Sequence, residues 1–242
     1  MTNVAPITSR RGLFKLAGAM GAAAAFAGTL SACGTSPAQR TSEATNVKGP
    51  TIRAAISYEL GTNGFDPMTT TSALTVAANW HTMEGLTEIL PSGDRQVYAA
   101  LGKALPKKVN DLTYEVTLRE GATFHNGTPV TPEDVVYSFE RVLDPNNKSL
   151  YAGFIGFLDK VEKKDATSVT IKLKQPYSLV AERLAVVKVV PKAAATADPK
   201  AFDANPVGTG PYKMVDNSAT SKQVVCEKFE DYTGPRPAKA NS

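Results

Sequence analysis

The segment that most constrains the fold is residues 131–143, TPEDVVYSFERVL, which carries a complete amphipathic-helix pattern. Thr131 is a strong N-cap residue, and Pro132 suits the first helical position. The two acids that follow suit the positive end of the helix dipole. The apolar side chains recur at helical spacing; they are Val135, Val136, Phe139, Val142 and Leu143. Such a helix is stable only when its apolar stripe packs on another apolar surface.

Two flanking segments can supply that surface. Residues 112–119, LTYEVTLR, and residues 168–174, SVTIKLK, alternate between apolar and polar side chains. This period of two predicts half-buried strands, with Tyr114, Val116 and Leu118 on one face of the first. The residues between the first strand and the helix predict a loop with a turn at Asn126-Gly127.

Further strands are predicted at residues 51–57 and 222–229, and further helices at residues 73–85 and 177–185. Gly85 is expected to close the first of these helices. Because strands and helices are mixed without a regular βαβ rhythm, the expected fold class is α/β or mixed α+β.

The N-terminus has the pattern of an export signal. Residues 16–30 carry no charge, but the run is too short for a comfortable membrane span of about 20 residues. Arg10 and Arg11 precede it in SRRGLFK, which resembles a twin-arginine signal with the usual Phe-Leu order swapped. Residues 1–32 are therefore expected to be a signal peptide, with the general secretion route as the alternative to the twin-arginine route.

Cys33 ends the run Leu30-Ser31-Ala32-Cys33, which resembles a bacterial lipoprotein box. A thiolate is a good nucleophile for alkylation, and several acyl chains would anchor the protein stably. If Cys33 is lipidated, residues 33–49 are this cysteine and a flexible polar tether. The alternative for Cys33 is an incidental cysteine beside an ordinary cleavage site. Cys226 would remain a free, unreactive thiol in a strand.

The charge of the chain argues against a nucleic-acid partner. The net charge of +4 comes largely from the signal, because residues 1–32 hold three basic side chains and no acid. Residues 33–242 thus carry 24 basic against 23 acidic side chains, a formal charge of +1. A nucleic-acid footprint needs a concentrated basic patch.

The chain offers no catalytic or metal-binding pattern. Its two histidines, His81 and His125, have no partner at metal-ligand spacing, and His125 in FHNG is expected to be structural. Glu133 and Asp134 are expected to serve the helix start rather than acid–base chemistry. GTGPY at residues 208–212 opens no helix, so it does not predict a phosphate site. The sequence predicts a binding protein, with no enzyme activity, cofactor or metal site.

Residues 118–145, LREGATFHNGTPVTPEDVVYSFERVLDP, resemble the signature of the large extracytoplasmic solute-binding proteins of ABC importers, the peptide- and nickel-binding family 5. Four other stretches agree in order and spacing: FDPMTT (65–70), MEGL (83–86), NPVGTGPYKMV (205–215) and FEDYTGPRP (229–237). The resemblance covers residues 51 to about 237.

The resemblance implies a type II periplasmic-binding-protein fold, in which two lobes close around the ligand. It places residues 50–85 and 186–242 in a partial first lobe and residues 86–185 in a subdomain inserted into it. Family members are about twice as long, so the second lobe is expected to be missing. A lone lobe would leave cleft and strand edges exposed, which predicts aggregation unless a second chain completes it.

The resemblance also suggests ligand contacts at Thr71, Ser72 and Ala73, after the Asp-Pro loop, and at Tyr151 after ERVLDP. An ordinary surface loop and simple packing are the alternatives for these two sites. Trp80 is expected to be a core residue.

The implied function is a lipid-anchored protein on the outer face of the cytoplasmic membrane that delivers oligopeptides to an ABC permease. The alternatives are a nickel or metal-chelate ligand, another solute, and a truncated sensor or surface lipoprotein without transport.

Overall fold

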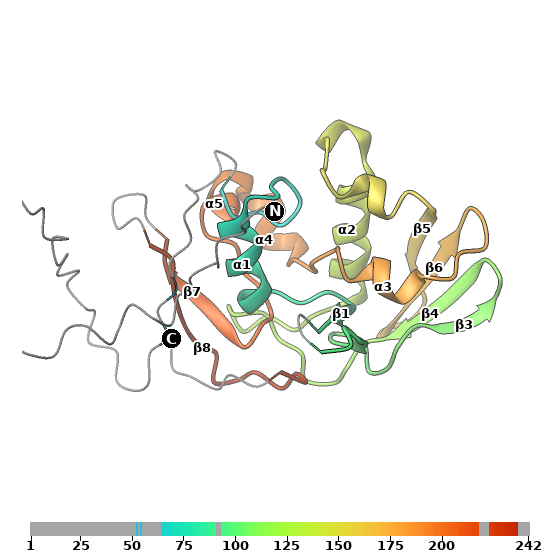
Figure 1. The fold of residues 1–242 in the computed structure, drawn as a ribbon, viewed down its shortest axis with the longest axis horizontal. Coiled ribbons are helices and arrows are strands. Elements are labelled where there is room, and N and C mark those ends of the chain that lie inside the picture. Colours follow the sequence, from blue (N-terminus) through green and yellow to red (C-terminus); the bar gives the residue numbers. More distant parts are fainter. Residues whose placement is uncertain (1–51, 53, 55–63, 91–92, 218–222, 237–242) are drawn as a thin grey trace, which may run out of the picture. The chain divides into compact units, whose positions relative to one another are not determined.

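The computed structural model describes residues 52, 54, 64–90, 93–217 and 223–236 (Figure 1). The export signal, Cys33 and nearly all of the strand predicted at residues 51–57 lie outside these residues. Among the helices described, none is both long and apolar enough to cross a bilayer.

The largest sheet is antiparallel, with the order β3-β4-β6-β5. Its strands are β3 (Lys107–Asn110), β4 (Thr113–Thr117), β5 (Leu158–Lys163) and β6 (Ser168–Leu173). Val116 pairs with Val169 and Tyr114 with Ile171 across β4 and β6, so the two predicted strands are confirmed and adjacent. β3 and β5 were not predicted, because β3 is exposed along its whole length and β5 is rich in charges.

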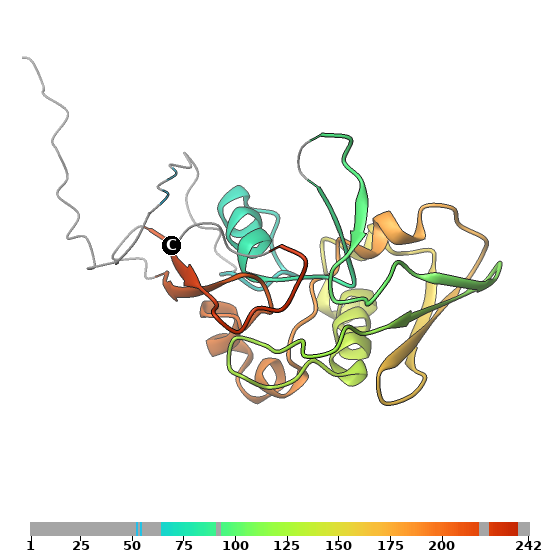
Figure 2. The ribbon, with the colours of Figure 1, turned by 90° about the horizontal axis from the view of Figure 1, so that it is seen from below.

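Helix α2 (Pro132–Leu143) packs on this sheet through β5 and β6 (Figures 1 and 2). The predicted cap is present: the Asp134 amide donates to Thr131 Oγ1, and the Thr131 amide donates to Asp134 Oδ2 at 3.0 Å. Val135, Phe139 and Val142 are buried against the sheet. The main hydrophobic cluster draws all its fully buried members from residues 86–189.

Helix α1 (Ala73–Thr82) ends three residues earlier than predicted. Met83, not Gly85, is its C-cap, and its extended backbone (φ −132°, ψ 153°) ends the helix. The buried side of α1 is partly polar, since Thr75 and Asn79 lie inward beside Ala78. These polar side chains bond the backbone of the preceding loop, which apolar periodicity alone does not reveal.

The remaining elements are short. β1 (Thr87–Ile89) pairs antiparallel with β2 (Val97–Ala99), and β7 (Tyr212–Asp216) pairs antiparallel with β8 (Val225–Lys228). The short helices are α3 (Val180–Leu184), α4 (Lys192–Ala197) and α5 (Pro199–Ala204), with 3-10 turns at Pro145–Asn147 and Ala152–Phe154. Strand β7 packs beside α1 (Figure 2). The helix predicted at residues 177–185 and the strand at 222–229 are confirmed in shortened form.

The GTGPY segment docks onto the end of α1 and onto the FHNG loop. The Gly210 amide donates to the Thr82 carbonyl at 2.9 Å, and the His125 amide donates to the Gly208 carbonyl at 2.8 Å. His125 Nε2 lies 3.0 Å from the Gly210 carbonyl, and burial lowers the pKa of its imidazole to about 4. A Cβ atom on Gly208 would collide with the Thr82 carbonyl. Both motifs are therefore structural.

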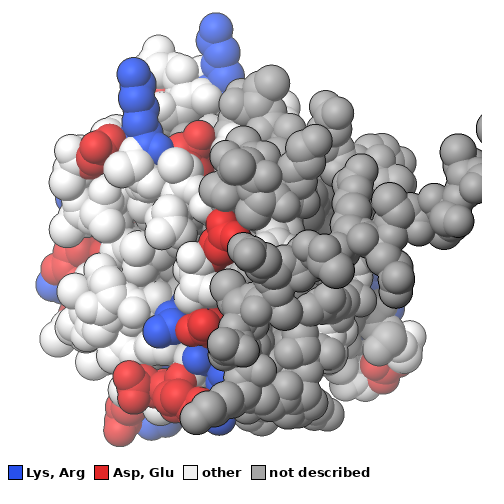
Figure 3. All heavy atoms as spheres, turned by 90° about the vertical axis from the view of Figure 1, so that its left-hand side faces the viewer, with Lys and Arg blue, Asp and Glu red and all other residues white. Residues whose placement is uncertain are grey.

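Figure 3 shows one face of the molecule with basic and acidic side chains interspersed over its described part.

Candidate ligand-facing surface

The loop that precedes Thr71 is held in place by three helices. From α1, Asn79 Nδ2 donates to the Phe65 carbonyl at 2.9 Å and Thr75 Oγ1 donates to the Gly64 carbonyl at 3.1 Å. From α5, the Asp203 carbonyl accepts from the Phe65 amide at 2.8 Å. The third helix, α2, contributes an arginine to Asp66.

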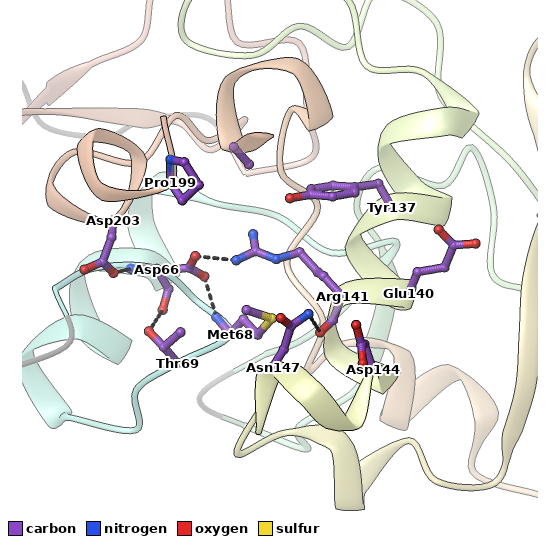
Figure 4. Close-up of a pocket in the computed structure, with 11 residues that line it drawn as sticks. Asp66, Met68, Thr69, Tyr137, Glu140, Arg141, Asp144, Asn147, Pro199 and Asp203 are labelled. Carbon is purple, nitrogen blue, oxygen red and sulfur yellow. Dashed lines mark hydrogen bonds and ion pairs between the residues drawn. The ribbon is translucent and has the colours of Figure 1, made fainter. Parts of the chain in front are cut away.

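Arg141 of α2 forms an ion pair with Asp66, and both side chains are 9% exposed (Figure 4). The guanidinium lies 5.7 Å from the Tyr137 ring centroid and 5.8 Å from that of Phe202. Removing one partner would leave a buried charge without its counter-ion. The pair therefore ties the Asp-Pro loop to α2 and positions the residues that follow the loop.

A hollow of about 760 Å³ lies beside this ion pair. Besides Arg141 it is lined by four acidic residues: Asp66, Glu140, Asp144 and Asp203 (Figure 4). Burial raises the pKa of Asp203, although the amide of Asp66 donates to it. With its one guanidinium committed to Asp66, the hollow is net acidic and suits neutral or cationic groups.

The structure brings Tyr151 next to the predicted contact segment. Tyr151 Oη donates to the Thr70 carbonyl at 3.1 Å, and Ser149 Oγ donates to the Met68 carbonyl at 3.0 Å. Thr71 and Ala73 are exposed, whereas Ser72 is partly buried at the N-cap of α1 without a capping bond. Their contact with a ligand stays a prediction; the structure links Tyr151 to Thr70, the residue that precedes the three.

Trp80 is only partly buried, so its expected place in the core is wrong. The Lys188 ammonium lies 5.8 Å from its ring centroid, and Arg236 Nη2 donates to its carbonyl at 3.2 Å. Lys188 also pairs with buried Glu88. The tryptophan thus sits at a polar junction.

Sequence reasoning missed a buried network that joins three of the motifs. Glu84 of MEGL is 0% exposed and accepts from Arg119 Nη2 of LREG at 2.8 Å. Tyr232 Oη of FEDYTG donates to the other Glu84 oxygen at 2.7 Å. Burial raises the pKa of Glu84, while Arg119 and Tyr232 oppose that rise. The sequence offered one signal of this network: Glu84 in MEGL and Arg119 in LREG are charged residues next to apolar ones.

The described residues contain no group of three or more His, Cys, Asp or Glu side chains placed to hold a metal ion. Cys226 is a free, partly buried thiol on β8, and burial raises its pKa to about 11. Since the thiolate is the reactive form, this cysteine is unreactive near neutral pH.

Comparison with known proteins shows which family this chain resembles. Residues 96–242 match the family model of bacterial extracellular solute-binding proteins, family 5, middle part. A glutathione-binding protein of Pectobacterium atrosepticum is 32% identical over 141 residues, 57% of this chain and 27% of its own length. Protein XP55 of Streptomyces lividans is 37% identical over 150 residues, 60% of this chain and 27% of its own. The chain thus spans about a quarter of the length of these relatives.

Solved structures agree on the fold. OppA of Listeria monocytogenes bound to peptide aligns with a TM-score of 0.65 and 21% identity, over 73% of this chain and 38% of its own. NikZ of Campylobacter jejuni with Ni(L-His) aligns with a TM-score of 0.62 and 23% identity, over 72% and 35%. The predicted fold class is confirmed: the chain has part of a type II periplasmic-binding-protein fold.

Proposed function

The chain belongs to family 5 of the bacterial extracellular solute-binding proteins, and we propose that it binds oligopeptides for an ABC importer. The match over residues 96–242 is the observation that carries this proposal. Its relatives include a glutathione-binding protein and a peptide-bound OppA, and glutathione is itself a small peptide. Binding and delivery, rather than catalysis, is the role proposed here.

The ligand would lie against Thr71, Ser72, Ala73 and Tyr151. The bond from Tyr151 to the Thr70 carbonyl supports this placement, since it fixes an aromatic ring beside the segment that leads into α1, where Thr71 and Ala73 are exposed. The ion pair between Asp66 and Arg141 would hold the segment in register.

The domain division follows the same proposal. Residues 86–185 would form the inserted subdomain, and residues 50–85 and 186–242 would form part of the first lobe. The main hydrophobic cluster supports this division, because its fully buried residues run from Leu86 to Val189. A second lobe, which the ligand would also contact, would complete the clamp.

Lipid anchoring on the outer face of the cytoplasmic membrane completes the proposal. Cys33 would carry the lipid, and Arg10 and Arg11 would direct export; all three lie outside the described residues. Intact mass spectrometry of the native protein from membranes tests this role. Acyl groups on a chain that begins at Cys33 are expected, and their loss is expected in Cys33→Ala. An unlipidated native mass contradicts the role given to Cys33.

Peptide binding is tested by incubating the full chain with an equimolar set of probes, followed by native mass spectrometry and calorimetry. The set holds Ala-Ala-Ala, Ala-Ala-Phe, Ala-Phe-Ala-Phe, reduced glutathione and Ni(L-His). Retention of one or more of the four peptides is expected. Retention of Ni(L-His) alone would favour the metal-chelate alternative, and no retention at all would refute solute binding.

The proposed surface is tested with Tyr151→Ala. Loss of an aromatic contact at the centre of a binding surface is expected to weaken peptide affinity by about tenfold or more. Tyr114→Phe, on β4 of the main sheet, is the control and should bind as the parent chain does. Equal peptide affinity in the parent chain, Tyr151→Ala and Tyr114→Phe would show that Tyr151 does not contact the ligand.

A further inference from the structure

Two pairs of aromatic side chains, bridged by an arginine, form a row that begins at Tyr151. The ring centroids of Tyr151 and Phe154 lie 6.3 Å apart. Further along, the rings of Phe157 and Tyr177 stack, with centroids 4.1 Å apart and planes 17° from parallel. Three of the four rings lie within residues 151–157, and Tyr177 is 20 residues further along the chain. One cation contacts a ring of each pair.

That cation is Arg183. Its Nε donates to Tyr177 Oη at 3.2 Å, and its guanidinium carbon lies 5.8 Å from the Phe154 ring centroid. These contacts fix the side chain between two rings. They also leave both terminal nitrogens of the guanidinium, the Nη atoms, without a bond to any residue that the structure describes.

Arg183 differs in this respect from the two arginines that carry buried ion pairs. Arg119 pairs with Glu84 and Arg141 with Asp66. Arg183 has no carboxylate within 4.0 Å among the described residues, although the chain is otherwise rich in such pairs. A guanidinium with a planar fork of free donors is best satisfied by a carboxylate.

The helix that carries Arg183 is firmly seated. Val180 and Leu184 of α3 are 2% and 0% exposed within the main hydrophobic cluster. Thr87 Oγ1 of β1 donates to the Ala181 carbonyl at 2.7 Å. Because its helix and its Nε are both held, Arg183 would lose little conformational freedom on binding.

Large exposed apolar side chains accompany the row: Phe154 at the Arg183 guanidinium, Leu179, whose carbonyl accepts from the Arg183 amide, and Leu150, next to Tyr151 in the chain. Leu150 is 53% exposed, Phe154 47% and Leu179 45%. Large exposed apolar side chains that cluster mark binding surfaces more often than isolated ones do. They also lower the local polarity, which strengthens a charge-assisted hydrogen bond beside them.

We propose that Arg183, framed by Phe154 and Tyr177, binds a carboxylate of the solute, while the neighbouring aromatic row takes its apolar part. This inference rests on the proposed function and narrows it. The substrate class is a peptide with a free C-terminal carboxylate and an apolar or aromatic side chain near that end. Tyr151 belongs both to this row and to the proposed ligand surface, so one solute can span the two.

The first experiment changes the ligand, so it does not depend on a variant that folds. Calorimetry with the full chain compares Ala-Ala-Phe with its C-terminal amide, Ala-Ala-Phe-NH₂. Loss of a charge-assisted pair at a partly exposed site is expected to weaken binding by about tenfold. Equal affinity for the acid and the amide overturns the inference and leaves peptide binding intact. Binding of neither peptide contradicts the proposed function and the inference with it.

The second experiment assigns the carboxylate to its partner. Arg183→Gln should bind the acid and the amide equally, because the cation is gone. Arg183→Lys should keep part of the preference, since it keeps the charge but not the fork. Lys107→Gln, an exposed position on β3, removes the same charge elsewhere and should keep the full preference. A full preference in a folded Arg183→Gln protein would overturn the assignment.

Discussion

At the scale of single residues, the buried carboxylate of Glu84 depends on its partners Arg119 and Tyr232. Glu84→Gln removes the negative charge that pairs with Arg119 and leaves one acceptor oxygen for two donors, Arg119 and Tyr232. Breaking a buried pair from one side is expected to lower the free energy of unfolding by about 3 kcal/mol, measured by urea denaturation.

The matched control is Glu120→Gln. The pair between Glu120 and Lys103 is exposed on both sides, at 90% and 65% of the side chains. Its loss should change the free energy of unfolding by less than about 0.5 kcal/mol. Similar losses in the two variants would mean that the Glu84 network does not stabilise the fold.

His125 predicts a pH dependence of stability. Burial holds its folded pKa at about 4, below the ordinary value of 6.5. The folded protein therefore binds this proton less tightly than the unfolded chain does. The stabilisation is complete above pH 6.5 and is lost as the pH falls from 6.5 to about 4, with a total of about 3 kcal/mol.

Urea denaturation of the parent chain and His125→Gln across this range checks the prediction. Other groups titrate there too, so the difference between the two proteins is the quantity to measure. It should shrink as the pH falls from 6.5 to 4. A difference that stays constant would show that His125 keeps its ordinary pKa in the folded protein.

Residue patterns could not have revealed the two buried ion pairs. Asp66 and Arg141 are 75 positions apart, and Glu84 and Arg119 are 35 apart. Local periodicity reports which side chains face inward, not which distant side chain they meet. The structural role of His125 was predicted correctly because its loop offered no ligand partner.

At the scale of elements, the close packing of the GTGPY segment against the C-terminal end of α1 requires glycine at position 208. Gly208→Ala would place a methyl group against the Thr82 carbonyl, which is backbone at a helix end and cannot move easily. The expected loss in the free energy of unfolding is about 3 kcal/mol or more. Gly153→Ala is the control, because nothing lies within 4 Å of its Cβ and its backbone is ordinary. Equal urea midpoints in both variants would contradict this packing.

Elements with a complete pattern were predicted well, and elements without one were missed. The helix at Pro132–Leu143 has an N-cap residue, acidic residues in its first turn and an apolar stripe. Its bounds therefore agree closely with the prediction. Strand β3, with Lys107 and Lys108 exposed at a sheet edge, has no alternation to detect. Helix α1 was predicted, but its predicted end lies three residues beyond the observed one. Its inward side chains Thr75 and Asn79 bond the backbone of the preceding loop, so apolar spacing did not mark the end of the helix.

At the scale of the whole molecule, the hydrophobic clusters are unequal. The main cluster lies within residues 86–189, whereas the two smaller ones have three fully buried members each. A chain of residues 86–190 is therefore expected to keep the sheet and α2 and to unfold cooperatively in urea. Its midpoint should fall below that of the full chain, since Glu84 and the Gly210 segment are gone.

The complementary chain, residues 64–85 joined to 191–236 by a glycine linker, should lack cooperative unfolding. Its five buried cluster residues, Phe65, Ala78, Ala195, Phe202 and Met214, cannot offset the conformational entropy of so many ordered residues. Far-ultraviolet circular dichroism of both chains checks the contrast. A folded complementary chain, or a disordered 86–190 chain, would contradict a division at these positions.

The place of Trp80 gives the molecule a built-in optical reporter. It is the sole tryptophan of the sequence, and it touches Lys188 and Arg236 at the polar junction described above. Indole emission excited at the red edge of its absorption therefore comes from one spot, without labelling. A change in its wavelength on adding a solute would register rearrangement where α1, the 188 segment and the C-terminal segment meet.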